Sequence, residues 1–519
     1  MYPGKWAALK PDAPAVIMSG SGASLSYAEL EAGSVRLARL MRDAGLRPGD
    51  CVALLSDNNP RCYEIYWAAQ RSGLYITAVN RHLAPSEVAY IVSDCGAKGL
   101  FASAAKAELA EAVVAEGLPE VRLRLSFGGD VKGYERYEPA VAAFPPAPMG
   151  DQPRGADMLY SSGTTGRPKG IRPPLPQRQV NEPGDPLVAL FGSRYGFGPD
   201  TVYLSPAPVY HAAPLRFGAV VHALGGTIVM MERFDPEQAL AAIERYRVTH
   251  TQMVPTMFVR MLKLPQDVRD GYDLSSLRVA VHAAAPCPVD AKQAMMRWWG
   301  PILHEYYSCT ETNGITLIGP DEWLRRPGSV GRAGIGVPHV CDDEGRELPT
   351  GEIGTIYFER DELPFEYHND PERTQAAQHP RHPTWTTVGD VGHLDDDGYL
   401  FLTDRKNFMI ISGGVNIYPQ EIENVLVMHP DVIDAAVIGI PDDEMGEQVR
   451  AVVQAAEGVE AGSELEQRLI AFVRRHIAHY KAPRSIDFVD RLPRTPTGKL
   501  VKGRLRDRYL SQGVDVGDR

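Results

Sequence analysis

The sequence predicts an α/β protein, with a large N-terminal domain of stacked α/β sheets, a β-rich subdomain and a small C-terminal α+β domain. Strand-like and helix-like segments alternate through roughly the first 280 residues, which is typical of parallel α/β units. From about residue 340, short strands and turns replace this alternation. The chain has 519 residues, more than one hydrophobic core normally serves, so at least two domains are expected.

The N-terminal elements follow from apolar spacing. Residues 26–45 place apolar side chains on one helical face and end at a glycine, which predicts a helix. The apolar run 51–55 predicts a buried strand, and a helix follows it as far as Gly73. Residues 75–79 then predict a strand and 85–94 a helix. The same alternation predicts elements at Thr201–Leu204, Gly226–Met231, Pro236–Tyr246, Thr249–Val254 and Leu277–Ala283.

The C-terminal part has a different organisation. Strands are predicted at 354–359 and 398–402, and a compact mixed segment begins after Asn407. Its expected elements are a helix at about 419–428, strands at about 431–440 and 448–455, and a helix at about 463–478. We therefore expect a large domain over 1–404, a hinge at 405–407 and a small domain over 408–519. Earlier in the chain, five prolines between 173 and 186 preclude a regular helix there.

Composition excludes several classes of protein. Hydrophobic residues make up 44% and charged residues 23%, as in ordinary globular proteins. A net charge of −12 argues against a general nucleic-acid binder, which needs a basic face. The six cysteines form no Cys-x-x-Cys pair and no disulfide scaffold, so a reduced cytoplasmic protein is the simpler expectation. No signal peptide and no transmembrane segment is predicted, although a peripheral membrane contact stays compatible.

The most distinctive segment is 160–170, Tyr-Ser-Ser-Gly-Thr-Thr-Gly-Arg-Pro-Lys-Gly. Its glycines allow a ligand close to the backbone, and its hydroxyls and lysine suit phosphate oxygens. It is not a Walker A loop, because Arg167 and Pro168 separate the glycine from the lysine and no Ser or Thr follows. By itself the segment is equally consistent with a Gly/Ser/Thr turn. The candidate phosphate-binding residues are Ser161, Ser162, Gly163, Thr164, Thr165, Gly166 and Lys169.

Four further motifs follow in order at 307–311, 389–390, 404–406 and 493–500. Together the five motifs resemble the adenylate-forming superfamily of acyl-CoA synthetases, amino-acid adenylation domains and luciferases. The resemblance covers nearly the whole chain, from about Leu25 to about Tyr509. It implies activation of a carboxylic acid with ATP and Mg²⁺ as an acyl-adenylate, and a small C-terminal domain that is mobile.

The resemblance assigns the nucleotide-binding residues. It implies that Thr164, Thr165 and Lys169 contact the β- and γ-phosphates. In Tyr-Ser-Cys-Thr-Glu at 307–311, Tyr307 would stack on adenine, Thr310 would hold the α-phosphate and Glu311 would bind Mg²⁺. Ser308 replaces the family's usual glycine. The alternative for Glu311 is an ordinary loop acid.

Two more segments complete the nucleotide site by resemblance. A small-residue loop whose backbone would lie along adenine comprises Ala283, Ala284, Ala285 and Pro286. The preceding His282 is as consistent with a packed core as with a pocket. Asp390 would accept both ribose hydroxyls, since a carboxylate suits a vicinal diol, and Arg405 would lie on the ribose. Both charges are alternatively exposed surface groups.

The small domain carries three further expectations. Lys499, in Pro-Thr-Gly-Lys, resembles the adenylation lysine that reaches the acyl oxygen and the α-phosphate; otherwise it is a solvated surface charge. Asn407 occupies the hinge position, where the family usually has Asp or Lys, and asparagine tolerates unusual backbone angles. CoA contacts are expected from Ser412, Gly413 and Gly414, with Gly414 leaving a passage for the pantetheine arm.

The acid is predicted to be hydrophobic. Segment 206–215 lacks the acidic residue with which amino-acid-activating relatives pair the substrate ammonium group. His211 resembles the residue that gates the family's carboxylate site, and we count it among the catalytic candidates. Apolar residues that are equally consistent with an acyl pocket or with the core are Leu215, Phe217, Met253, Val254, Pro255 and Met257. Segment 409–419 looks most like bacterial fatty-acyl-CoA synthetases, some relatives of which act on steroid-type acids.

The sequence thus predicts an AMP-forming acid–CoA ligase for a fatty or a bulky alicyclic or steroid-type acid. Acyl-adenylate would form first, and the CoA thiol would then give the thioester. Two alternatives stay open: an enzyme that loads a carrier protein, and a non-catalytic nucleotide-binding relative. The expected partners are the small-molecule acid, ATP and CoA, and a homodimer is compatible with the sequence.

Overall fold

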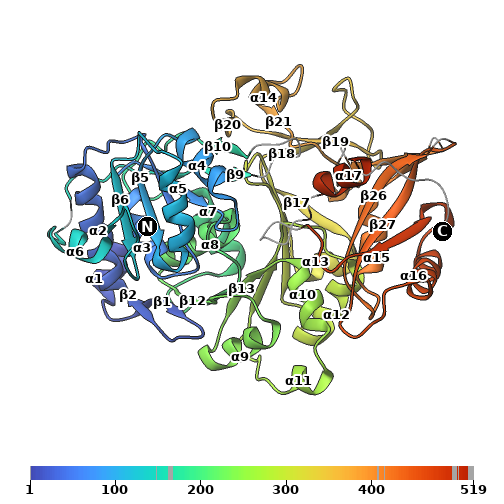
Figure 1. Ribbon diagram of the computed structural model, residues 1–519, viewed down its shortest axis with the longest axis horizontal. Helices are drawn as coiled ribbons and strands as arrows, with labels where there is room; N and C mark the ends of the chain where they lie inside the picture. The colour runs from blue at the N-terminus through green and yellow to red at the C-terminus, as the bar shows by residue number, and fades with distance from the viewer. Residues whose placement is uncertain are drawn as a thin grey trace. The chain divides into compact units, whose positions relative to one another are not determined.

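The computed structural model describes residues 2–147, 149–161, 168–405, 408–413, 415–442, 444–493, 500 and 502–511. The chain divides into two compact units (Figure 1). The first unit comprises 1–253, 270–280 and 364–375; the second comprises 254–269, 281–363 and 376–519. Both are mixtures of helices and sheets, which confirms the predicted α/β fold class.

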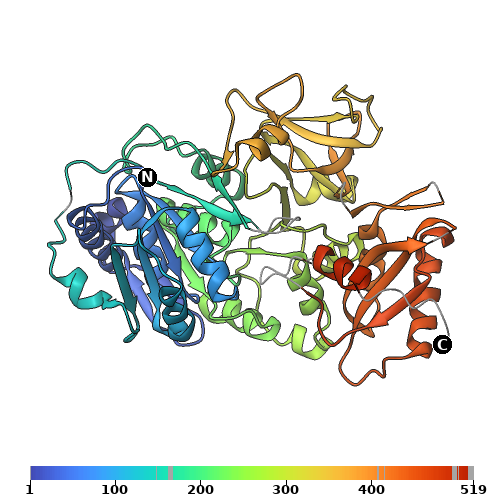
Figure 2. The ribbon, with the colours of Figure 1, turned by 45° about the horizontal axis from the view of Figure 1, so that its top comes forward.

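The first unit contains a fully parallel six-stranded sheet of order β7-β6-β5-β3-β4-β8. Its strands are β3 (Cys51–Leu55), β4 (Tyr75–Val79), β5 (Ala97–Ser103), β6 (Leu123–Phe127), β7 (Glu135–Arg136) and β8 (Ala156–Asp157). The helices α4 (Pro85–Asp94) and α5 (Ala107–Ala115) bury Val88, Ile91 and Val113 in a core shared with this sheet. The sheet is therefore covered by helices, as parallel sheets require (Figure 2).

A second set of strands in the first unit has the order β13-β11-β12-β1-β2, parallel except for the β1–β2 pair. These strands are β1 (Pro14–Met18), β2 (Ser24–Ser26), β11 (Val202–Ser205), β12 (Thr227–Met230) and β13 (His250–Met253). A small antiparallel sheet of order β20-β10-β9 comprises β9 (Leu159–Ser161), β10 (Lys169–Arg172) and β20 (Glu366–Tyr367). Parallel strand ends and this small sheet carry the candidate site residues of the first unit.

The second unit begins with an antiparallel run of order β18-β19-β22-β23-β17-β16-β15. Its strands are β15 (Leu303–Tyr307), β16 (Ile315–Ile318), β17 (Ser329–Ile335), β18 (Val337–Cys341), β19 (Gly354–Glu359), β22 (Asp390–Leu394) and β23 (Leu400–Arg405), with β21 (Trp385–Thr386) paired to β19. The strand β14 (Val279–His282) spans the boundary between the units in sequence. The predicted β-rich region is therefore present, but it begins at Leu303 and not at about residue 340.

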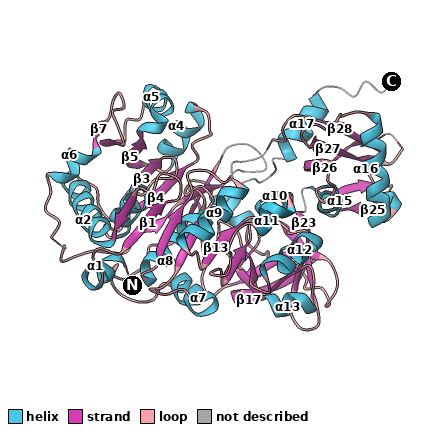
Figure 3. Ribbon diagram, turned by 90° about the horizontal axis from the view of Figure 1, so that it is seen from below, coloured by secondary structure: helices cyan, strands magenta, loops and turns pink. Residues whose placement is uncertain are grey.

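The C-terminal sheet is buried on both faces (Figure 3). Its strands are β24 (Ile410–Ser412), β25 (Val415–Ile417), β26 (Val432–Asp442), β27 (Gly446–Ala455) and β28 (Ser485–Phe488). Along β26, Ala435 and Val437 pack with the helices α15 (Pro419–Leu426) and α16 (Ser463–His476). The intervening Ala436 and Ile438 join a second core with Leu505 of α17 (Lys502–Ser511). Successive side chains of a strand point to opposite faces, so the two cores alternate along β26.

The remaining helices surround these sheets. They are α1 (Pro3–Leu9), α2 (Tyr27–Asp43), α3 (Arg61–Gln70), α6 (Tyr137–Ala142), α7 (Pro186–Tyr195), α8 (Ala212–Leu224), α9 (Pro236–Tyr246), α10 (Pro255–Leu262), α11 (Gln266–Asp270), α12 (Val289–Trp299), α13 (Pro320–Arg325) and α14 (Pro371–Ala376). No helix lies within 171–185, and α7 begins at Pro186, the last of the five prolines. Of the described helices, none combines the length and apolar character needed to cross a membrane.

Buried histidines should make the fold sensitive to acid. Burial lowers the pKa of His222 and of His250 to about 4, so both stay neutral in the folded protein down to that pH. In the unfolded chain they take up protons below about pH 6.5. Because the unfolded state then binds more protons, stability should fall between about pH 7 and pH 4, by about 1.4 kcal/mol per pH unit for each histidine.

The measurement is urea unfolding at pH 7.5, 6.5 and 5.5. The variant His222→Gln serves as the comparison. It lacks a titrating group at the position where Trp67 Nε1 donates to His222 Nδ1 over 3.2 Å. Its stability should depend less steeply on pH than that of the wild type. Parallel pH dependences in the two proteins would contradict this origin of the acid sensitivity.

Candidate active site

The predicted phosphate loop connects two paired strands. Ser161 ends β9 and Lys169 begins β10, and the two residues face each other in the antiparallel register. Residues 162–167, among them the candidates Ser162, Gly163, Thr164, Thr165 and Gly166, lie outside the described residues. The Ser161 hydroxyl is buried and makes no hydrogen bond with any described residue. A buried hydroxyl in that state suits an oxygen-rich ligand.

The strand before this loop is anchored at its base. The Tyr160 hydroxyl donates to Asp94 Oδ2 over 2.5 Å, and burial together with Cys95 and this carboxylate raises the pKa of Tyr160. A Cβ atom at Gly170 would lie 2.9 Å from Cζ of Tyr160, too close for any side chain. Gly170 is therefore required for the close approach of β10 to Tyr160.

Lys169 contacts an aromatic side chain that the sequence did not single out. Its Nζ donates to the Tyr367 hydroxyl over 2.8 Å and lies 4.1 Å from the centre of that ring. Tyr367 reaches this position because β20 pairs with β10, with Tyr367 opposite Ile171. The ring and the hydroxyl thus hold the ammonium group at the start of β10, beside Ser161.

In the second unit, two predicted nucleoside-binding residues meet directly. The Tyr307 hydroxyl, at the end of β15, donates to Asp390 Oδ2, at the start of β22, over 2.7 Å. Asp390 also lies opposite Arg405 in the β22–β23 register; the Arg405 side chain lies outside the described residues. Two candidate residues separated by 83 positions in the sequence are therefore in direct contact.

The segment after Tyr307 is held by its own polar side chains. The Ser308 hydroxyl donates to the Gly314 carbonyl over 2.8 Å, so the side chain that replaces the family's glycine has a structural bond. Asn313 donates to the Thr386 carbonyl over 3.0 Å and accepts from the Gly314 amide. This loop presents Thr310 on the partly exposed side and the largely buried carboxylate of Glu311. Asn313 is a positioning residue that sequence reasoning missed.

The small-residue loop follows β14 directly. Ala283 is buried, whereas Ala284, Ala285 and Pro286 are exposed. Ala284 has φ 76°, a left-handed conformation that is uncommon outside glycine and that clusters at functional sites. The exposed backbone here fits the predicted role along a flat base. His282, by contrast, is fully buried, which favours its interpretation as a core histidine.

His211 precedes α8 and is held neutral. Its Nε2 is buried without a hydrogen bond to any described residue, and its ring lies 4.2 Å from that of Tyr210. Burial, followed by the charges of His82 and Arg81, lowers its pKa to about 3. At neutral pH the His211 side chain is therefore an uncharged imidazole.

The remaining candidates belong to the second unit. Ser412 ends β24 and pairs with Val415 of β25, and Gly413 has φ 57° in the turn between them. Asn407, Gly414 and Lys499 lie outside the described residues. The described residues contain no group of three or more acidic, histidine or cysteine side chains placed to hold a metal.

The apolar candidates for an acyl pocket are mostly buried. Phe217 stacks on Phe191 at 4.6 Å and on Tyr203 at 6.1 Å, within an aromatic cluster of the first unit. Leu215 and Met253 are also fully buried there. In the second unit, Pro255 and Met257 are buried and Val254 is partly exposed.

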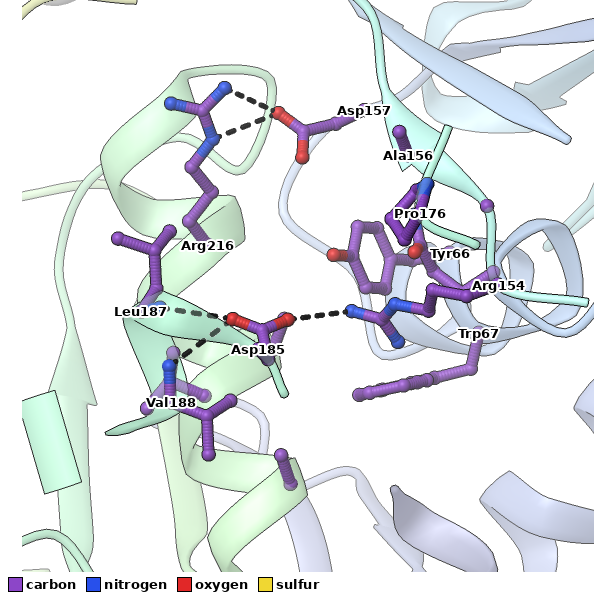
Figure 4. Close-up of a pocket in the computed structure, with 15 residues that line it drawn as sticks. Tyr66, Trp67, Arg154, Ala156, Asp157, Pro176, Asp185, Leu187, Val188 and Arg216 are labelled. Atoms are coloured by element: carbon purple, nitrogen blue, oxygen red, sulfur yellow. Dashed lines mark hydrogen bonds and ion pairs between the residues drawn. The ribbon is translucent and has the colours of Figure 1, made fainter. Parts of the chain in front are cut away.

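A separate cavity of about 120 Å³ lies in the first unit between α3 and α8 (Figure 4). The proline-rich stretch contributes Pro176 and Asp185 to its wall. Asp185 caps α7 by accepting from the Leu187 and Val188 amides, and it also pairs with Arg154 at 3.2 Å. The proline-rich stretch between 173 and 186 thus forms part of the cavity wall and ends at the cap of α7.

This double role makes Asp185 testable. Asp185→Ala should lower the free energy of unfolding by about 1–2 kcal/mol, because it removes the cap and leaves Arg154 largely buried without that partner. Asp185→Asn keeps a capping oxygen but no charge and should cost less. Urea unfolding of both variants measures the difference; equal losses would mean that the cap contributes little.

Comparison with known proteins identifies the family of this chain. Residues 4–367 match the model of the AMP-binding enzyme family, and residues 421–499 match the AMP-binding enzyme C-terminal domain. The chain is 34% identical to a feruloyl-CoA synthase from Amycolatopsis sp, over 98% of each chain. It is 32% identical to the long-chain-fatty-acid–CoA ligase FadD13 of Mycobacterium tuberculosis, over 97% of each. The crystal structure of ATP-bound MatB from Rhodopseudomonas palustris superposes with a TM-score of 0.81 at 29% identity, covering 98% of this chain and 99% of that one.

These comparisons show an adenylate-forming enzyme. The chain belongs to the AMP-binding enzyme family, and within it to the AMP-forming acyl-CoA synthetases. The acid–CoA ligases of this family use ATP and CoA. The predicted membership of the adenylate-forming superfamily and the predicted enzyme class are thereby confirmed.

Proposed function

We propose that this ligase activates a hydrophobic carboxylic acid, fatty or bulky alicyclic, as its acyl-adenylate and then transfers the acyl group to CoA. The observation that carries the proposal is the 2.7 Å hydrogen bond between Tyr307 and Asp390. It brings a ring suited to adenine next to a carboxylate suited to a ribose diol. Thr310 and Glu311 follow Tyr307 on the same loop, where the α-phosphate and its metal would be held.

The residues present fit the ATP phosphates and Mg²⁺. Lys169 and the buried Ser161 hydroxyl supply a cation and a hydrogen-bonding group at the phosphate loop. Mg²⁺ is usually held by one or two protein carboxylates together with substrate phosphates, so Glu311 alone is a sufficient protein ligand. The bound ion would neutralise phosphate charge while Lys499 stabilises the charge that develops on the reacting oxygens.

The choice of a hydrophobic acid rests on the loop before α8. Segment 206–215 carries no acidic residue that would pair with an amino acid's ammonium group. Leu215, within this segment, and Phe217 and Met253, elsewhere in the first unit, are buried and apolar, and residues of this kind predominate in ligand pockets. The domain limits at 404 and 408, the hinge at Asn407, the CoA passage at Gly414 and a homodimer remain parts of this proposal.

Acid-dependent release of pyrophosphate from Mg·ATP tests the proposal. The panel is octanoate, palmitate, ferulate and cholate, each with and without CoA. Sustained release that needs both acid and CoA is expected for the aliphatic or the steroid acid. Release that CoA does not stimulate would contradict CoA as the acceptor and indicate a carrier protein. Release with ferulate alone would contradict the proposed acid class, and silence with every acid would contradict the proposed function.

A further inference from the structure

Three buried polar atoms of the first unit make no hydrogen bond with any described residue: Arg81 Nη1, the Tyr210 hydroxyl and His211 Nε2. Such atoms are rare in folded proteins, because a buried donor without a partner loses its water at a cost of about 1–3 kcal/mol. Three such atoms close together are polar groups available to a ligand.

The three side chains occupy one neighbourhood. The Arg81 guanidinium carbon lies 6.0 Å from the centre of the Tyr210 ring, and the Tyr210 and His211 rings are 4.2 Å apart. The charge of Arg81 acts on both, since it opposes the burial that raises the pKa of Tyr210 and helps to lower the pKa of His211. Tyr210 itself is only 6% exposed.

This neighbourhood is built at strand ends. Arg81 follows β4, and Tyr210 and His211 follow β11, so both segments leave the carboxyl ends of parallel strands, where ligands of open α/β sheets bind. Asn58, which follows β3, fixes the second segment. Its Nδ2 donates to the Ala207 carbonyl over 3.2 Å and its Oδ1 accepts from the Val209 amide over 3.0 Å.

The chemistry of the three groups matches one carboxylate. Arg81 Nε donates to the neutral acceptor His82 Nε2 over 3.3 Å, but Arg81 has no ion pair with any described residue, so no carboxylate of that part of the chain balances its charge. His211 is neutral at pH 7 and adds no second charge. A guanidinium N–H, a phenol and an imidazole N–H, in the tautomer protonated at Nε2, are three donors; a carboxylate has two oxygens with about four acceptor positions.

We propose that Arg81, Tyr210 and His211 form a cradle that receives the carboxylate of the acid substrate, with Arg81 as its cation. This inference rests on the proposed function and adds two binding residues, Arg81 and Tyr210, that sequence reasoning did not select. The cradle orients the carboxylate anion before adenylation and discriminates against neutral analogues of the acid.

The test measures the steady-state KM for the best panel acid and for ATP in Arg81→Gln, Arg81→Lys and Tyr210→Phe. Arg81→Gln should raise the KM for the acid about 10–100-fold while the KM for ATP stays within about 2-fold. Arg81→Lys should recover part of the loss, because it restores the charge but not the planar donor geometry. Tyr210→Phe keeps the ring and should raise the acid KM by about 3–10-fold. Arg245→Gln, an exposed arginine of the same unit, is the matched control.

A neutral analogue separates recognition of charge from a folding defect. The primary amide of the same acid should inhibit the wild type and Arg81→Gln with similar constants, since it lacks the charge that Arg81 would bind. An unchanged acid KM in Arg81→Gln and in Tyr210→Phe, with turnover retained, would overturn the cradle and leave the proposed function intact. A wild type that is silent with every acid would instead overturn the proposed function itself.

Discussion

Replacing Lys292 with methionine should lower the free energy of unfolding by about 3–5 kcal/mol, because it leaves a buried carboxylate without its cationic partner. Lys292 Nζ donates to Glu305 Oε2 over 2.6 Å, and His282 Nε2 lies 3.4 Å from the same oxygen. Lys292 is fully buried and lies 4.6 Å from the centre of the Trp323 ring. Burial raises the pKa of Glu305, while Lys292 opposes that rise. Without Lys292, Glu305 must either take up a proton or remain an unpaired charge.

The double variant Lys292→Met/Glu305→Leu tests that reason. Removal of both charges leaves apolar groups of similar volume, so its stability should return to within about 1–2 kcal/mol of the wild type. Lys98→Met is the control, since it breaks the more exposed Lys98–Glu120 pair and should cost about 1 kcal/mol or less. Urea unfolding compares the free energies of unfolding of the wild type and these three variants. If the double variant is no more stable than Lys292→Met, loss of packing, and not loss of pairing, is the cause.

Replacing Lys499 with alanine should slow acyl-adenylate formation by about 10²–10³-fold, the usual effect of removing one group that stabilises developing charge. The resemblance to adenylate-forming enzymes assigns Lys499 to the first step only. Thioester formation from a supplied acyl-adenylate and CoA should therefore remain close to the wild-type rate.

Two rates are needed for this second test. Pyrophosphate release reports the first step, and thioester formation from synthetic acyl-adenylate reports the second. Lys132→Ala, an exposed lysine, should leave both rates unchanged. Equal losses in both steps for Lys499→Ala would contradict a lysine that serves only adenylation.

The local sequence pattern was enough to predict the bounds of many helices and strands. The helix α9 has the predicted bounds, because Asp235 caps it through the Glu237 and Gln238 amides just before a proline. The helix α4 likewise begins at a proline where one was expected. Strong apolar spacing between clear stops leaves little choice of conformation, which is why these bounds were predictable.

The partners of the site residues could not be predicted in the same way. Tyr367 contacts Lys169 across 198 positions, and only the pairing of β20 with β10 creates that contact. Lys292 and Arg81 look like surface charges in the sequence, since nothing local shows that one is buried against Glu305 and the other near Tyr210. Motif order predicted candidate nucleotide-binding residues, but long-range packing determines which side chains contact them.

The alternation of two cores along β26 has a consequence for natural variation and for protein engineering. In a strand with one solvent-exposed face, every second side chain is exposed, and substitutions at those positions are tolerated. Ala435, Ala436, Val437 and Ile438 are all buried, so none of these four consecutive positions is an exposed site that would tolerate substitution. Substitutions should therefore be tolerated in the helices and hairpins around the strand, whereas the sequence of the strand itself should vary little.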